Sequence, residues 1–268
     1  MAATTAPISN MSNAFSVAGY NVLVTGGSKG IGLGIAEAFA QCGANVAILC
    51  RDAAQGREAL NLLERHGTNC LCLSCNVADL NSVRSAVKEA LSFWGHIDVL
   101  VNNAGSAIIG SFLEDVDLSH WHTVLATNLD GPANLCHEVA PGMIARGAGC
   151  IINISSTGAQ SVDNTRTHPK ISYHVSKAGL DHFTRYLASE LGGTGVRVNC
   201  IEPGITHTDL DRFLPPEVFD MVDSRLPMGR FADPLEVGAL CVYMASPAGC
   251  HMTGSVVVHD GGLLCMSD

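Results

Sequence analysis

The sequence predicts an α/β protein in which one doubly wound, seven-stranded parallel sheet carries helices on both faces. Short apolar runs alternate with helix-patterned segments along the chain, and these runs are almost continuously apolar, as in strands that are buried on both sides. Right-handed crossovers between such strands give a doubly wound sheet. The 28 glycines and the aromatic content of 5% suit many tight strand–helix turns better than a β-sandwich. We therefore expect one catalytic domain over residues 16–268, preceded by a disordered tail over residues 1–15.

The expected elements follow one another in a regular strand–turn–helix order. The first strand is an apolar, β-rich run that ends at a glycine-rich turn, and a helical run follows that turn. The seven expected strands are 21–25, 45–50, 69–74, 98–101, 150–154, 197–201 and 255–258. The expected helices are 31–42, 53–66, 80–94, 118–129, 134–146, 172–191 and 234–245. Pro234 suits the first turn of the last helix, whereas Pro141 is a defect inside its helix.

Charge and hydropathy argue against two kinds of partner. Fifteen Lys and Arg against 25 Asp and Glu give a net charge of −10, and phosphate backbones need clustered basic residues, so nucleic acid is not expected. No membrane span is expected, because even residues 240–260 are interrupted by Ser, Pro, Gly and His. The first 13 residues lack the basic and apolar regions of a signal peptide, so we expect a cytoplasmic protein.

The 11 cysteines are expected to be reduced and mostly buried as small apolar residues. The spacing of Cys70, Cys72 and Cys75 resembles that of a metal site. However, residues 69–74 alternate like a strand, and no second Cys/His pair follows at zinc-finger spacing. The sequence therefore predicts no metal site.

The glycine-rich turn between the first strand and the first helix is a candidate dinucleotide site. Glycines at its turns let backbone amides approach a pyrophosphate at the helix N-terminus. Their spacing is Gly-x3-Gly-x-Gly, which differs from G-x-G-x-x-G, and the alternative is an ordinary glycine-rich turn. The position between strand and helix favours the cofactor site. The candidate residues are Gly26, Ser28, Lys29, Gly30, Ile31 and Gly32.

The end of the second strand favours NADP(H) over NAD(H). An NAD site normally has a carboxylate there that accepts hydrogen bonds from the ribose hydroxyls. Here Cys50 stands at that position and Arg51 follows it. A guanidinium suits a 2′-phosphate in charge and geometry, and Lys29 in the glycine turn adds a second cation. The alternative is that Arg51 is only a solvated surface residue.

The candidate catalytic pair lies near the start of the long helix. A spacing of four places Tyr173 and Lys177 on one helix face. A free phenol, with a pKa of about 10, is a poor base near neutrality, but a nearby ammonium favours a phenolate electrostatically. Such a pair can therefore serve as general acid or base. The pattern alone is also common on helix surfaces, so its position after the fifth strand, which ends at Ser155 and Ser156, is what supports the assignment.

Several motifs in order make the chain resemble the short-chain dehydrogenase/reductase family, in its single-domain subgroup, over roughly residues 17–262. Such a protein is expected to have a Rossmann fold. The matching residues are the glycine turn, Asn102-Asn103-Ala104-Gly105, Asn128, Ile154-Ser155-Ser156, Tyr173-x3-Lys177, Asn199-x3-Pro203-Gly204 with Thr208, and Asp260-Gly261-Gly262.

The resemblance implies a catalytic tetrad. Tyr173 would donate or accept the proton, and Ser156 would hydrogen-bond the substrate oxygen. Lys177 would bind the nicotinamide ribose, and Asn128 would hold a water that links Lys177 to solvent. Ser155 remains the alternative to Ser156, since adjacent strand residues face opposite ways.

The resemblance also implies the rest of the cofactor site. Asn76 and Val77 would contact adenine, although the family commonly has an acid at the first position. The segment after the fourth strand would line the adenosine ribose, and the segment after the sixth strand would hold the nicotinamide carboxamide. These further residues are Asn103, Ala104, Gly105, Pro203, Gly204, Ile205 and Thr208.

Two segments border the expected substrate pocket. Residues 206–231 are expected to form a mobile helical lid with an apolar lining. Residues 162–170 lengthen the usual gap between Ser156 and Tyr173, so the substrate class does not transfer from the family, and the alternative is a surface insertion.

The resulting prediction is an NADPH-dependent carbonyl reductase, or alcohol dehydrogenase in reverse, acting on a small-molecule ketone or secondary alcohol. The alternative is an NADP-binding sensor or scaffold without turnover. A homotetramer or dimer is expected, because the family pairs its long helices, here with apolar faces that include Val139, Met143, Phe183 and Leu187.

Overall fold

The computed structural model describes residues 11–162, 168–208 and 226–265, and these residues form one seven-stranded sheet. Its strand order is β3-β2-β1-β4-β5-β6-β7, and every pairing is parallel. The strands are β1 (Asn21–Thr25), β2 (Asn45–Cys50), β3 (Cys70–Ser74), β4 (Val99–Asn102), β5 (Gly149–Ile154), β6 (Val196–Pro203) and β7 (Val256–His259). The order reverses between β1 and β4, which confirms the expected doubly wound sheet and creates a crevice at that point.

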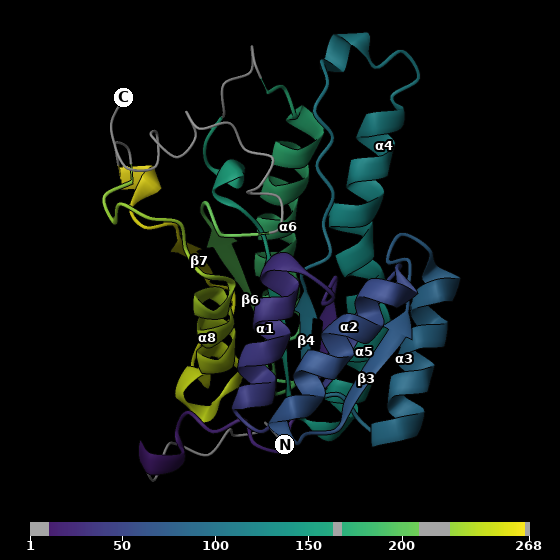
Figure 1. Cartoon of the computed structure of the whole chain (residues 1–268), viewed down its shortest axis with the longest axis vertical. Coiled ribbons are helices and arrows are strands. Elements are labelled where there is room, and N and C mark those ends of the chain that lie inside the picture. Colours follow the sequence, from purple (N-terminus) through teal and green to yellow (C-terminus); the bar gives the residue numbers. More distant parts are fainter. Residues whose placement is uncertain (1–10, 163–167, 209–225, 266–268) are drawn as a thin grey trace.

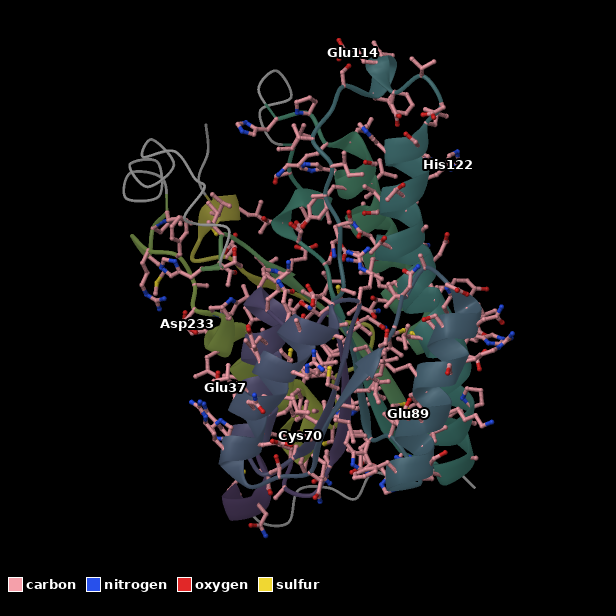
Figure 2. The ribbon with its side chains drawn as sticks, turned by 45° about the vertical axis from the view of Figure 1, so that its right-hand side comes forward. Glu37, Cys70, Glu89, Glu114, His122 and Asp233 are labelled. Atoms are coloured by element: carbon pink, nitrogen blue, oxygen red, sulfur yellow. The ribbon has the colours of Figure 1, made fainter. Side chains whose placement is uncertain are left out.

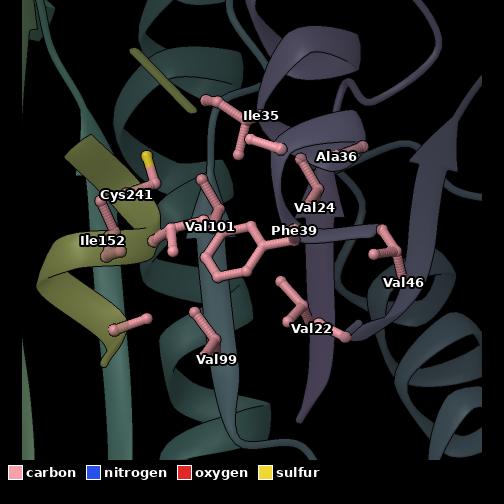
Figure 3. Close-up of a cluster of buried hydrophobic side chains, with 14 of the residues drawn as sticks. Val22, Val24, Ile35, Ala36, Phe39, Val46, Val99, Val101, Ile152 and Cys241 are labelled. Carbon is pink, nitrogen blue, oxygen red and sulfur yellow. The ribbon is translucent and has the colours of Figure 1, made fainter. Parts of the chain in front are cut away.

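The helices cover both faces of the sheet (Figure 1). One buried cluster joins the sheet to α1, α2 and α8, and the other joins it to α3, α5 and α6. The helices are α1 (Gly30–Gln41), α2 (Ala53–Leu63), α3 (Leu80–Trp94), α4 (Ser119–Leu125), α5 (Gly131–Arg146), α6 (Ile171–Glu190) and α8 (Pro234–Ala245). In Figure 3, Phe39 of α1 packs among Val22, Val99 and Val101 of the two central strands.

The helix before β5 differs from the expected two separate helices. α4 continues through a π-helical turn, Ala126–Asp130, directly into α5. Pro132 stands in the first turn of α5, and Pro141 is accommodated inside it. Glu114 lies at the tip of the projection that carries α4 away from the sheet (Figure 2).

The ends of the expected domain also have structure. Met11–Asn13 forms a short 3-10 turn, and Ala14 is buried, with its carbonyl accepting a hydrogen bond from the Ala248 amide. Residues 11–15, which the sequence assigned to the tail, therefore belong to the described structure. Most of the expected lid, residues 209–225, and residues 163–167 of the expected insertion lie outside the described part.

The apolar residues expected to face a second subunit have a different location. Val139 and Met143 are buried in the α3–α5–α6 cluster, and Phe183 and Leu187 pack against that cluster. For Val139 and Met143 the expectation is wrong, because these side chains are covered within one chain. Phe183 and Leu187 are only half-buried.

Candidate active site

The loops after the strands meet at the carboxyl edge of the sheet and enclose a cleft of about 640 Å³. Parallel strands bring such loops together at a topological switch point. Residues expected from the sequence that line this cleft are Gly26, Ser28, Lys29, Ile31, Gly32, Arg51, Asn76, Val77, Asn103, Ala104, Gly105, Tyr173, Lys177 and Thr208. The cleft thus brings together residues from the glycine turn, four later loops and α6.

The turn between β1 and α1 is fixed from the β4 loop. The Asn103 side-chain amide donates to the carbonyls of Thr25 (2.9 Å) and Gly26 (3.3 Å). In return, the Thr25 hydroxyl accepts the backbone amides of Asn103 and Ala104, both at 2.9 Å. Gly26 has φ +64°, and a Cβ on Gly32 would lie 2.2 Å from the Gly26 oxygen. These contacts place the N-terminus of α1 against the cleft.

Two cationic side chains and one neutral thiol lie at the adenosine end of the cleft. Lys29 and Arg51 are exposed, and both line the cleft together with Cys50. Burial first, and then the neighbouring Cys72 sulfur at 3.7 Å, raise the pKa of Cys50 to about 12. The neighbouring carboxylate of Asp52 accepts the first amides of α2, from Ala54 (2.8 Å) and Gln55 (3.2 Å). This end of the cleft therefore favours an anionic ligand.

Tyr173 and Lys177 lie on one face of α6 and border the same cleft. Lys177 is 4% exposed, its Nζ lies 5.7 Å from the centre of the Tyr173 ring, and it donates to the Ile154 carbonyl at 2.7 Å. A second ammonium, that of Lys170, also lies 5.7 Å from the ring centre. Among the described residues this ammonium donates to one carbonyl, so it keeps donor capacity for a ligand hydroxyl.

The two serines after β5 have different partners. Ser155 is buried, and its hydroxyl donates to the Lys177 backbone carbonyl at 3.1 Å, which attaches β5 to α6. The half-buried Ser156 begins the 3-10 turn Thr157–Ala159, and its oxygen accepts the Gly158 amide at 3.1 Å. The Ser156 proton is therefore available to a ligand, although Ser156 itself does not line the described cleft.

Asn128 lies in the π-helical turn and connects the β4 loop to α6. Its amide nitrogen donates to the Ser106 carbonyl (2.9 Å) and the Ser176 hydroxyl (3.0 Å), and its oxygen accepts the Ser106 amide (2.7 Å). Asn128 is fully buried and does not line the cleft. A Cβ on Gly105 would lie 3.7 Å from the Asn128 oxygen and 3.8 Å from Lys177 Nζ, so this turn lies directly behind the cleft wall.

The segment after β6 reaches the cleft through Thr208. Pro203, Gly204, Ile205 and also Gly30 do not line the cleft. The Gly204 amide bonds the His259 carbonyl at 2.9 Å, and the Ile205 carbonyl accepts the Ala232 amide at 3.0 Å. The position of a Cβ on Gly30 lies 3.4 Å from Thr208 Cγ2, so this segment meets the glycine turn.

Comparison with known proteins decides the family. The model described as enoyl-(acyl carrier protein) reductase matches residues 26–264. The 3-oxoacyl-(acyl-carrier-protein) reductase of Chlamydia muridarum is 35% identical over 90% of this chain and 96% of that protein. The D-threitol dehydrogenase of Mycolicibacterium smegmatis is 37% identical over 92% and 94% of the two chains. The chain belongs to the short-chain dehydrogenase/reductase family.

Solved structures of short-chain dehydrogenases/reductases share the whole architecture. The NADPH-dependent 3-quinuclidinone reductase of Rhodotorula rubra has a TM-score of 0.89 at 31% identity, covering 97% of this chain and 96% of that one. The chain is accordingly an oxidoreductase of this family that acts on alcohols or ketones, with a small-molecule substrate.

Other residues of this short-chain dehydrogenase/reductase line the cleft without having been assigned to the site from the sequence, although Cys50, Ile154 and Ser155 stand in motifs named above. They are Leu49, Cys50, Asp52, Gln55, Cys75, Ser106, Ala107, Thr127, Ile154 and Ser155. Most flank an expected residue by one or two positions, so extending each motif by two residues would have found them. Gln55 is the exception, because it lies four positions after Arg51, in the first turn of α2.

Two further observations concern metals and membranes. Over the described ranges, no three His, Cys, Asp or Glu side chains are placed to hold a metal ion. The helices among those residues are all too short or too polar to cross a membrane.

Proposed function

We propose that the chain is an NADPH-preferring carbonyl reductase that also runs as an alcohol dehydrogenase. The observation that carries the proposal is that Lys29 and Arg51 line one end of the same cleft that Tyr173 and Lys177 border. A ligand with phosphates at one end and a reactive ring at the other suits that distribution. The relatives above are named for a 3-oxoacyl-(acyl-carrier protein), D-threitol and 3-quinuclidinone, which supports a ketone or secondary alcohol as the substrate class.

The described residues fit a nicotinamide dinucleotide. The close approach of Gly32 to Gly26 leaves no space for a side chain there, so backbone amides of the turn and of α1 can reach a pyrophosphate. The Cys50 thiol stays neutral because burial raises its pKa to about 12, so it does not repel a 2′-phosphate. The Asp52 carboxylate is engaged by the amides of α2. Arg51 and Lys29 would then pair with that phosphate.

When bound, the nicotinamide supplies a hydride to the carbonyl carbon in reduction and accepts one in oxidation. In reduction, the Tyr173 hydroxyl donates its proton to the carbonyl oxygen, which becomes the alcohol hydroxyl. The Ser156 hydroxyl donates a hydrogen bond to the same oxygen and stabilises the negative charge that develops on it. In oxidation, Tyr173 takes the proton back.

Lys177 and Asn128 support these steps. The Lys177 ammonium, fixed by the Ile154 carbonyl, stabilises negative charge near Tyr173 and is placed to hold a ribose hydroxyl of the cofactor. Asn128 fixes the Ser106 backbone and, through Ser176, the helix that carries both Tyr173 and Lys177. We infer that Asn128 maintains the route by which Lys177 exchanges protons with solvent.

Substituting Tyr173→Phe tests this function directly. The ring remains while the proton-transfer group is lost, so turnover should fall by about 10² or more, the usual contribution of general acid–base catalysis. NADPH binding should stay close to normal. Cofactor fluorescence titration and NADPH absorbance loss with a panel of ketones measure the two effects. Tyr186→Phe is the matched control, because Tyr186 lies on the same helix and is 68% exposed.

Near-normal turnover in Tyr173→Phe would contradict the assigned role. A wild type that binds NADPH but reduces no carbonyl of the panel would favour the alternative of a cofactor-binding sensor.

A further inference from the structure

A buried carboxyl group that the mechanism does not use lies next to the site. Glu202 is in β6, one residue before Pro203, and it is fully buried. Its Oε2 accepts a hydrogen bond from the Gln160 side-chain amide at 2.5 Å. Its Oε1 is buried and accepts no hydrogen bond from an amide, hydroxyl or ammonium group among the described residues. Burying an ionised carboxylate with only one donor is costly, so this side chain calls for an explanation.

The carboxyl group of Glu202 interacts with that of another buried acid, Asp181 of α6, which is 5% exposed. Burial first, and then Asp181, raise the pKa of Glu202 to about 7. The Gln160 amide and Arg185 act in the opposite direction and do not cancel this shift. Asp181 in turn accepts a hydrogen bond from the Cys200 thiol at 3.3 Å. Two buried carboxyl groups in contact are most stable when one of them carries a proton.

Gln160 connects this pair to the turn that follows Ser156. The turn is compact, since the Ala159 amide donates to the Ser156 carbonyl (2.9 Å) and the Gln160 amide to the Thr157 carbonyl (3.0 Å). His174, next to Tyr173, lies against the turn's other side, with its Nδ1 2.7 Å from the Gly158 carbonyl oxygen. The turn between Ser156 and Gln160 is therefore held between α6 and the end of β6.

We propose that Glu202 and Asp181 share one proton. We further propose that this protonated pair positions the turn between Ser156 and Gln160, and with it Ser156, for the reaction. Glu202 is thus a positioning residue, since it acts through Gln160 and touches neither substrate nor cofactor. The positioning of Ser156 rests on the proposed reductase function, whereas the inference that Glu202 and Asp181 share a proton is independent of it.

The other titratable groups around the pair do not replace that proton. Cys200 lies two residues earlier in β6, and burial raises the pKa of its thiol well above the usual range, so it stays neutral. Lys177 is engaged by the Ile154 carbonyl. Arg185 lowers the pKa of Glu202 less than burial and Asp181 raise it. From β7, Val258 pairs with Glu202, and the nearest titratable residue is His259, which pairs with Pro203.

The raised pKa gives the pair a defined pH dependence. Glu202 has an ordinary pKa of 4.5 in the unfolded chain and about 7 in the folded protein, so the folded state binds more protons between these values. The free energy of unfolding therefore falls as pH rises from 4.5 to about 7, and this contribution is lost above that range. Above it, two buried carboxylates repel each other, so Glu202 moves away from Asp181 and carries with it the Gln160 side chain that remains hydrogen-bonded to it.

Three substitutions test the pair. Glu202→Gln keeps the volume, can still accept from Gln160, can donate to Asp181, and removes the titration. Asp181→Asn leaves Glu202 without a facing carboxylate, so its titration should move to lower pH. Glu190→Gln is the control, because Glu190 ends the same helix and is exposed. Thermal unfolding of the cofactor-free protein across this pH range is measured beside kcat and KM for NADPH-dependent reduction.

We expect Glu202→Gln to lose most of the wild-type fall in Tm between about pH 5 and pH 8, while Glu190→Gln keeps it. We expect its kcat to stay within about twofold of wild type near pH 6 and to exceed wild type by roughly threefold or more near pH 8.5, with little change in KM. Wild-type Tm behaviour in Glu202→Gln would overturn the shared proton. A pH-dependent Tm with identical kcat profiles would overturn the positioning role. A wild type without reductase activity would overturn the proposed function, and the Tm measurements would still decide the pair.

Discussion

The neighbouring residues Ser155 and Ser156 follow β5 but have different roles. Ser155 has a structural role, whereas Ser156 is the candidate for the chemical one. Strand geometry turns successive side chains to opposite sides, so the Ser155 hydroxyl meets the backbone of α6 while Ser156 begins the next turn. A hydroxyl that donates to a buried carbonyl cannot also donate to a substrate. The contact pattern thus favours Ser156, which the sequence alone could not separate from Ser155.

Alanine substitutions should separate the two serines. Ser156→Ala removes a donor to the reacting oxygen, and loss of one such donor typically lowers kcat by about 10²–10³. Ser155→Ala removes a hydrogen bond between β5 and α6, which should lower the free energy of unfolding by about 1 kcal/mol. Steady-state kinetics and urea unfolding of both variants provide the measurements. A larger loss of kcat in Ser155→Ala than in Ser156→Ala would exchange their roles.

We expect single residues at the end of β2 to decide the choice of cofactor as well. A hydrogen bond to a charged group contributes about 1.5–3 kcal/mol, which corresponds to a preference for NADPH of roughly ten- to a hundredfold. The double change Cys50→Asp with Arg51→Ala removes the attraction and adds a carboxylate, so the preference should reverse. The readout is kcat/KM with both cofactors at fixed ionic strength.

Arg57→Ala is the control for this test, because Arg57 is exposed on α2 and does not line the cleft. It should leave the cofactor preference unchanged. A wild type that prefers NADH would show that Arg51 is a solvated residue.

Among the elements, the β1 turn and α1 are packed too closely for any side chain at Gly32. A Cβ there would lie 2.2 Å from the Gly26 carbonyl oxygen and 2.4 Å from the Asn103 side-chain nitrogen Nδ2, so the backbone at Gly26 would have to move. Gly32→Ala should therefore weaken NADPH binding at least tenfold and lower the free energy of unfolding by about 1–3 kcal/mol. Calorimetric titration and thermal unfolding measure these effects.

A glycine in open space provides the matched comparison. Gly142 lies inside α5, and nothing lies within 4 Å of the position of its Cβ. Gly142→Ala should raise the free energy of unfolding by about 0.5–1 kcal/mol through helix propensity and leave NADPH binding unchanged. Equal effects of the two substitutions would show that α1 can shift to accept a side chain.

The strands and most helices were predictable because the sequence marks them locally. Continuous apolar runs identified all seven strands, although β3, β4 and β7 begin one residue later than expected and β5 and β6 one residue earlier. The π-helical turn was not predicted, because no local sequence pattern marks it. It is held by hydrogen bonds from Asn128 to Ser106 and Ser176, which are far away in the sequence. Helix propensity predicts that the helix ends before Pro132. In the structure the helix continues, because a proline is readily accommodated in the first turn of α5.

The candidate site was predictable where motifs carry it and not where tertiary contacts do. The glycine turn and the Tyr173–Lys177 pair have spacings that can be seen in the sequence. The Glu202–Asp181 pair does not, since its two acids are far apart in the sequence and meet only through packing of α6 on β6. Likewise, the sequence could not show that Val139 and Met143 would be covered by their own chain.

At the scale of the whole molecule, apolar side chains other than those expected remain uncovered on the long helices. Ile144 of α5 is 40% exposed, and Val175 and Tyr186 of α6 are 43% and 68% exposed. Stable interfaces bury about 800 Å² per partner around such anchors, and two-fold pairing presents the same patch twice. We therefore still expect a homodimer or homotetramer, carried by these residues.

Light scattering of the wild type at micromolar concentration should report two or four times the 28.0 kDa chain mass. Tyr186→Glu places two like charges near the symmetry axis of a dimer that uses α6, and like charges across an interface are costly, so this variant should dissociate to monomer at the same concentration. Leu62→Glu is the control, because Leu62 is 36% exposed on α2, which packs on the opposite face of the sheet, and it should keep the wild-type mass. A monomeric wild type would contradict the expected assembly. An oligomer that persists in Tyr186→Glu would place the interface elsewhere, because a buried, unpaired pair of carboxylates cannot be accommodated without a measurable loss of affinity.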